Sequence, residues 1–216
     1  MANMETDELF TQVRTAHRLL AAFYQRLLPS IEQIAKGLDV DFYTWSPKEF
    51  GRPAQLSTNP FDRWGWDMLP ALSTYYVFKH VEDNNKVRVG EYLVEFLVET
   101  DTVVKSDLAN GAEPDALNLP QNVGDAKSTL KISVYAPCEN SESNWHHNVW
   151  NECENHPACE TPEPIKDPDT AVVYCGFEVP LADLMKDGAV DVLIARAQEF
   201  IDITVEQAKS LSLESV

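Results

Sequence analysis

Residues Lys86–Thr100 read KVRVGEYLVEFLVET, and this stretch decides the fold. In one phase every residue of its central part is apolar: Tyr92, Val94, Phe96 and Val98. In the other phase leucine alternates with glutamate: Glu91, Leu93, Glu95, Leu97 and Glu99. A helix also fits part of the spacing, but the β-branched residues and the preceding turn Asp83–Asn85 favour a strand. We therefore predict a hairpin with Leu72–Glu82 that has one apolar and one carboxylate-bearing face.

Further strands are predicted where apolar residues alternate between turn-forming residues: Val40–Ser46, Lys127–Ala136 and Thr170–Val179. Apolar residues at helical spacing predict a long helix at each end of the chain, from Thr6 to about Leu38 and from about Val190 to Ala208. Within the first helix, Pro29 is expected to kink or split the run, and Gly37 to end it. His17 lies on the apolar stripe and is expected to pack in the core.

The segments between these strands contain too little helix for parallel crossovers, so the sheet should be largely antiparallel. The two terminal helices must bury their apolar stripes, which one face of the sheet provides. We predict a single two-layer α+β domain over residues 1–216, with about five strands and both helices on one face. Long loops are expected at 47–71, 102–126 and 138–169.

The chain has 216 residues and a formal net charge of -18. The charge is uneven, because residues 1–81 carry nine carboxylates against eight Lys and Arg, whereas residues 82–216 carry twenty-six against nine. An acidic surface repels phosphate and anionic lipid, so no direct binding to nucleic acid or membrane is expected. It suits a basic surface on a partner protein. An open antiparallel sheet also leaves edge pairing into a homodimer possible.

The passage Cys138–Asp169 carries eight carboxylates, one lysine, three cysteines and three histidines. Its candidate metal ligands are Cys153, His156, Cys159, His146 and His147. Zinc prefers thiolate and imidazole in tetrahedral sites, so a zinc site is one interpretation. The set lacks a C-x-x-C pair, and an acidic loop that is solvated or faces a partner is the other interpretation. In an oxidising compartment Cys153 and Cys159 could instead form a disulfide.

Two further groups are candidate partner-binding residues. The first contains the glutamates of the predicted strand, Glu91, Glu95 and Glu99, for which a solvated outer sheet face is the preferred interpretation. The second is the tryptophan pair of FDRWGWDMLP, Trp64 and Trp66, which either seals the edge of the core or forms an aromatic platform.

These patterns rank three functions. The leading one is a non-enzymatic, acidic protein-interaction module, such as an inhibitor or immunity protein or a mimic of nucleic-acid charge. The alternative is a metal-binding protein or metal-dependent hydrolase that uses the Cys/His-rich stretch 138–160. The third is an enzyme or small-molecule binder with a pocket beside Trp64 and Trp66. The polar, acidic start of the sequence, MANMETDELF, is unlike a secretory signal, so a cytoplasmic setting with reduced cysteines is expected.

Overall fold

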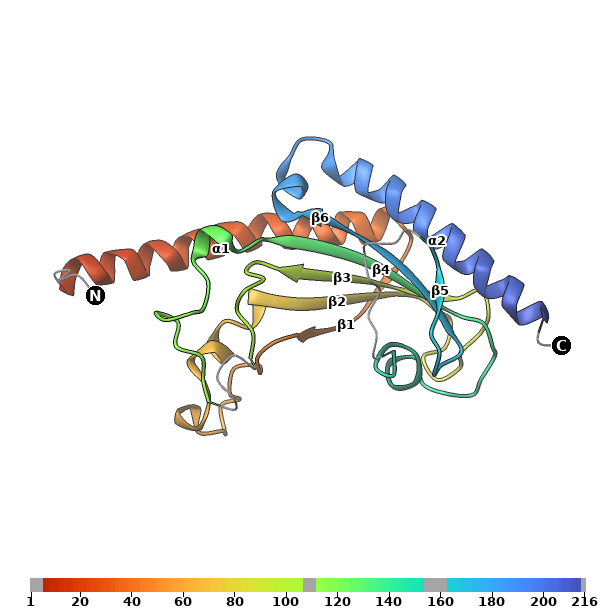
Figure 1. Cartoon of the computed structure of the whole chain (residues 1–216), viewed down its shortest axis with the longest axis horizontal. Coiled ribbons are helices and arrows are strands. Elements are labelled where there is room, and N and C mark those ends of the chain that lie inside the picture. Colours follow the sequence, from red (N-terminus) through yellow and green to blue (C-terminus); the bar gives the residue numbers. More distant parts are fainter. Residues whose placement is uncertain (1–5, 107–111, 154–162, 215–216) are drawn as a thin grey trace.

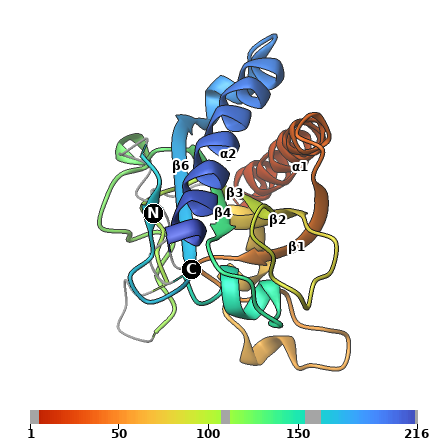
Figure 2. The same ribbon diagram turned by 90° about the vertical axis from the view of Figure 1, so that its right-hand side faces the viewer.

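The computed structural model describes residues 6–106, 112–153 and 163–214. Two long helices, α1 (Thr6–Gly37) and α2 (Ala189–Glu214), lie on one face of an antiparallel sheet (Figures 1 and 2). The strands are β1 (Asp41–Pro47), β2 (Ser73–His80), β3 (Tyr92–Glu99), β4 (Thr129–Pro137), β5 (Ile165–Lys166) and β6 (Val172–Pro180). Their order in the sheet is β1-β2-β3-β4-β6-β5. The predicted α+β architecture is confirmed, with six strands rather than about five.

The apolar phase of β3 faces the helices, as predicted. Phe96 lies in register between Tyr76 of β2 and Ile132 of β4, and it is fully buried. The helices contribute the other half of this core: Leu27, Ile31 and Ile34 from α1, and Ala197, Phe200 and Ile201 from α2. Burial of these side chains holds the two layers together, because each fully buried aliphatic or aromatic side chain contributes roughly 1.5–3 kcal/mol.

The second face of the sheet is also covered, so the prediction of a solvated outer face is wrong. All eight residues of β3 are buried. A second apolar cluster fills this face, formed by residues of the sheet and by Trp145, Val149 and Trp150. These three belong to or adjoin a π-helical turn, η5 (His146–Trp150). Part of the predicted loop 138–169 therefore folds back over the sheet.

Helix α1 differs from expectation in two ways. It continues through Pro29 without splitting, and the residues after Pro29 pack firmly onto the sheet, with Ile31 and Ile34 both buried. Its first half, by contrast, is exposed throughout residues 6–22, so His17 is not a core residue. Figure 1 shows this half running out beyond the ends of the strands. The stripe was recognised correctly, but the sheet is shorter than the helix.

Gly37 ends α1 as predicted, and its small size has a packing reason. A Cβ atom at this position would lie 2.4 Å from Cδ1 of Ile194 in α2. Glycine therefore lets the end of α1 approach α2 closely. The residue in left-handed conformation is instead Asp39, with φ 55°, two residues after the helix ends.

Two local predictions about strands need correction. The β2–β3 connection extends well beyond a tight turn, so Glu91 precedes β3 rather than forming part of it. Strand β5 was not predicted, because two residues between Pro164 and Pro168 are too few to show a period.

Candidate functional site

Two buried glutamates occupy the second face of β3. By register, Glu95 lies between Val77 of β2 and Ser133 of β4, and Glu99 lies one full pleat repeat further along. Their side chains point to the same face because two-residue steps along a strand keep to one side. The residues are 1 % and 2 % exposed, respectively. Neither can present its charge to a partner protein, which corrects the prediction for these two positions.

Glu95 sits in an apolar enclosure with two hydrogen-bond donors. Its Oε2 accepts from Nε1 of Trp150 at 2.6 Å and from the hydroxyl of Tyr135 at 3.3 Å. Burial raises the pKa of Glu95 to about 7, and these two donors only partly offset it. A carboxyl group with such a pKa exchanges its proton near neutrality. Trp150, which is 7 % exposed, covers it, so this chemistry is shielded from bulk solvent.

Glu99 has the opposite environment. Its Oε1 lies 2.9 Å from Nζ of Lys48 and 3.3 Å from Nζ of Lys105, and its Oε2 lies 3.2 Å from Nζ of Lys131. Burial alone would raise the pKa of Glu99, but the hydrogen bond from Lys48 and the three positive charges lower it to about 2. Lys105 also contacts Glu49 at 3.1 Å. Glu99 is thus a permanent charge that ties three separate segments to β3.

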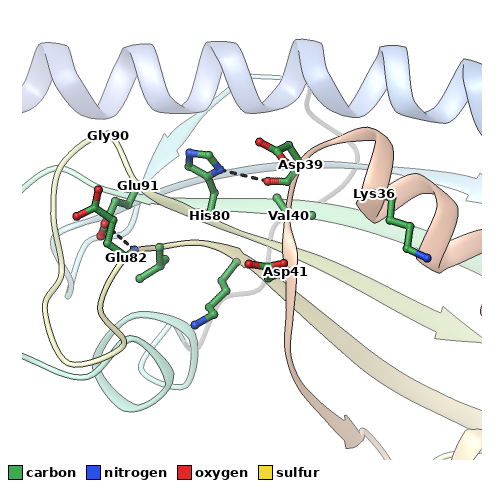
Figure 3. Close-up of a pocket in the computed structure, with 10 residues that line it drawn as sticks. Lys36, Asp39, Val40, Asp41, His80, Glu82, Gly90 and Glu91 are labelled. Atoms are coloured by element: carbon green, nitrogen blue, oxygen red, sulfur yellow. Dashed lines mark hydrogen bonds between the residues drawn. The ribbon is translucent and has the colours of Figure 1, made fainter.

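A cavity of about 530 Å³ opens where α1 ends and β1 begins (Figure 3). Figure 3 shows acidic side chains on both sides of it, and the charged lining comprises Lys36, Asp39, Asp41, Lys79, Glu82 and Glu91, beside His80. The imidazole of His80 stacks on Tyr92 with ring centroids 4.9 Å apart, and its Nδ1 lies 3.3 Å from the carbonyl oxygen of Asp39. The carboxylates outnumber the lysines, so the lining suits a cationic group better than an anion.

Glu91 is the most constrained group of this cavity. Its Oε1 accepts a hydrogen bond from the backbone N–H of Glu82 at 3.0 Å. Its Oε2 is buried without a hydrogen-bond partner among the described residues. Of the three glutamates predicted to bind a partner, Glu91 alone therefore borders an open space. The prediction that it contacts a protein partner stays a prediction.

The two tryptophans of the aromatic loop are half-buried and serve different contacts. Trp66 stacks on Phe50, with ring centroids 5.3 Å apart, and its Nε1 donates to the carbonyl oxygen of Pro114 at 2.8 Å. Trp64 meets the edge of Phe50 at 6.2 Å. The indoles thus join two loops. A shallow cavity of about 500 Å³ lies beside Trp66, so a role in binding a ligand there also stays a prediction.

The proposed metal ligands are not brought together by the part of the chain that the structure describes. His156 and Cys159 lie outside the described residues. Cys153 is buried beside Thr170, and burial raises the pKa of its thiol to about 12, which opposes the thiolate form that zinc requires. His146 and His147 stack on each other at the surface end of η5. Within residues 6–106, 112–153 and 163–214, no three His, Cys, Asp or Glu side chains are arranged to hold a metal ion.

Several residues of the buried network were not predicted from the sequence. Lys131 and Tyr135 were available, because both lie in the phase of β4 opposite to Leu130 and Ile132. Lys48 and Trp150 carry no such signal, since both come from segments without periodicity and meet β3 only through the tertiary fold. None of the described helices is long and apolar enough to cross a membrane.

Comparison with known proteins places the chain in a family but gives no function. A search of curated proteins finds no match, and a search of solved structures finds none either. A family model described as PM0109 matches residues 3–205, which is nearly the whole sequence. The chain therefore belongs to the PM0109 family.

Proposed function

We propose that the protein is a non-enzymatic interaction module that binds a basic surface of a partner protein through α2. The observation that supports this most directly is a row of exposed carboxylates along the outward face of that helix: Asp191, Glu199, Asp202 and Glu206. Their helical spacing brings them onto one side, opposite the buried residues that hold α2 to the sheet. We call this row the acidic ridge.

The acidic ridge is poorly neutralised by the helix that carries it. Its nearest arginine, Arg196, places its guanidinium 4.1 Å from the ring of Phe177 and 5.9 Å from that of Phe200. This cation–π packing draws the positive charge toward the core. Figure 2 shows α2 as an outer element of the helical layer, so its outward face is accessible to another protein.

Electrostatics explains what such a ridge would contribute. Complementary charge raises the association rate and selects among partners more than it adds affinity. The buried glutamates have a different role, because enclosure keeps Glu95 and Glu99 out of contact with any docked surface. The proposal includes a cytoplasmic setting, in which thiols such as those of Cys138, Cys153 and Cys175 stay reduced; all three are free in the structure.

The test is affinity capture from the source cells with the immobilised full chain, followed by binding measurements with the captured protein in purified form. We expect a basic partner whose association slows steeply as salt rises. A variant with Asp191→Asn, Glu199→Gln, Asp202→Asn and Glu206→Gln should associate at least about tenfold more slowly. The matched control neutralises four exposed carboxylates elsewhere: Asp62, Asp125, Glu139 and Asp169.

The control isolates position from total charge, since both variants lose four negative charges. If the two variants slow association equally, the ridge has no special role and only net charge matters. If the captured partner binds with no salt dependence, the proposal is wrong.

A further inference from the structure

The first half of α1 carries an apolar stripe that no described part of the chain covers. We call residues 6–22 the overhang, because all of them are exposed. The stripe there is the continuation of the one that packs on the sheet, since Leu9, Val13 and Leu20 follow the same helical spacing as Leu27 and Ile31. Leu9 is 40 % exposed, Phe10 55 %, Val13 40 %, Leu19 66 % and Leu20 36 %.

The overhang is long enough to form an interface. At 1.5 Å per residue it extends about 25 Å, and Figure 1 shows it standing free of the strands. At its base an apolar groove of about 340 Å³ is lined by Leu20 and Phe23 of α1 and by Leu181 and Met185 of the following turn. The exposed stripe and the groove form one continuous surface.

We propose that this surface binds the overhang of a second copy of the chain, with the two helices antiparallel. The sequence of the overhang is self-complementary in that direction: Leu9 pairs with Leu20, Phe10 with Leu19, and Val13 with Ala16. Every pair is apolar, and Leu9 of each copy reaches the groove at Leu20 and Phe23 of the other. The arrangement is a closed two-fold dimer in which both copies use the same residues.

Charge selects the antiparallel direction. Between Leu9 and Ile31 the helix contains Arg14, Arg18 and Arg26 and no carboxylate, whereas Asp7 and Glu8 occupy its first turn. Antiparallel alignment brings the acidic first turn of one copy alongside the stretch between Arg18 and Arg26 of the other. Parallel alignment would place each arginine beside its own copy, and like charges at helix interfaces are unfavourable.

The same charges argue for a second copy over pairing through the sheet edge. The edge strand β1 has an irregularity between Phe42 and Thr44 and ends in Pro47, two features that discourage edge-to-edge pairing. The overhang is also the least acidic exposed element of a chain with net charge -18, so two copies can approach there with less repulsion than elsewhere. The acidic ridge of α2 is a separate surface, so the dimer does not depend on the proposed function.

The first experiment measures the mass of the full chain by sedimentation equilibrium. We expect a species of twice the 24.3 kDa chain mass. Val13→Glu, which places two carboxylates at the dimer axis, should weaken dimerisation at least about tenfold. It should leave thermal unfolding of the monomer unchanged, because Val13 touches only the overhang. The control Val192→Glu makes the same replacement at an exposed site of α2, 67 % exposed, and should remain dimeric.

The second experiment fixes the direction. Chains carrying Leu9→Cys are mixed with chains carrying Leu20→Cys and oxidised mildly. A disulfide between the two kinds of chain is expected, whereas Leu9→Cys chains alone should not link to each other. A monomeric wild-type chain at the highest soluble concentration, a dimer that survives Val13→Glu, or efficient linking of Leu9→Cys chains alone would each overturn the proposal.

Discussion

The indole of Trp150 donates a 2.6 Å hydrogen bond to Oε2 of Glu95, across fifty-five residues of sequence. The bond fastens η5 to the centre of the sheet, on the face that the long helices do not cover. The same oxygen of Glu95 accepts from Tyr135 of the neighbouring strand. One carboxyl group thus joins β3, β4 and the acidic passage, and its protonation state affects all three.

Replacing Trp150 with Phe should destabilise the fold by about 1–3 kcal/mol, because a buried carboxyl loses its shorter hydrogen bond. The same change should raise the pKa of Glu95 further, since the donor that favours the ionised form is gone. Chemical denaturation and carbon-13 NMR of the carboxyl group measure the two effects. Trp145→Phe is the control, because the indole of Trp145 donates to the carbonyl oxygen of Lys86 at 2.9 Å instead. An equal change in the pKa of Glu95 in both variants would contradict the assignment.

Glu95 should make the protein less stable as the pH rises from about 4.5 to about 7. Burial raises the pKa of Glu95 from 4.5 to about 7, so the folded state holds a proton that the unfolded state has already released. The stabilisation from this group is complete below the unfolded pKa and is lost as the pH rises through the folded value. The shift corresponds to roughly 3 kcal/mol.

Glu95→Gln is the variant that tests this dependence. Gln keeps an acceptor oxygen for Trp150 and Tyr135 but does not titrate, so the variant should gain on the wild type by up to roughly 3 kcal/mol between pH 4 and pH 8. Urea denaturation at a series of pH values measures the difference. Parallel stability curves for the two proteins would show that Glu95 is not the responsible group.

Glu99 should have the reverse effect at lower pH. Although burial acts to raise the pKa of Glu99, its contacts with Lys48, Lys131 and Lys105 lower the value to about 2. Its stabilisation is present above the unfolded pKa of 4.5 and is lost as the pH falls toward 2. Glu99→Gln should therefore cost up to roughly 3 kcal/mol at pH 7 and much less at pH 2. The solvent exposure of the lysines reduces this figure, and a variant whose deficit is independent of pH would refute the prediction.

The alternation of β3 was sufficient to predict the strand, its apolar face and the antiparallel sheet, because a period of two is a local property. It did not predict that the carboxylate face is buried. That outcome depends on η5 and on the loops that carry Lys48 and Lys105, which reach β3 from distant parts of the sequence. A strand with glutamates at every fourth position reads as solvated unless the covering segments are known.

The helices show the same limit in the opposite direction. The stripe of α1 is regular from Leu9 to Leu38, and its period gives no sign that the sheet ends near Phe23. Pro29 predicted an interruption that packing overrides. In both helices the sequence determines which side is apolar, whereas the lengths of the strands determine how much of that side is covered.

Gly176 of β6 should tolerate a side chain less well than Gly37. A Cβ atom at Gly176 would lie 2.8 Å from the carbonyl oxygen of Ile132 and 2.9 Å from Oγ of Ser133, and backbone in a central strand cannot move aside. At Gly37 the obstacle is the end of the Ile194 side chain, which can change rotamer. We expect Gly176→Ala to cost about 2–3 kcal/mol and Gly37→Ala about 1 kcal/mol or less, measured by urea denaturation. A larger cost at Gly37 would mean that the α1–α2 contact is more rigid than the sheet, so that helix packing and not strand pairing limits the fold.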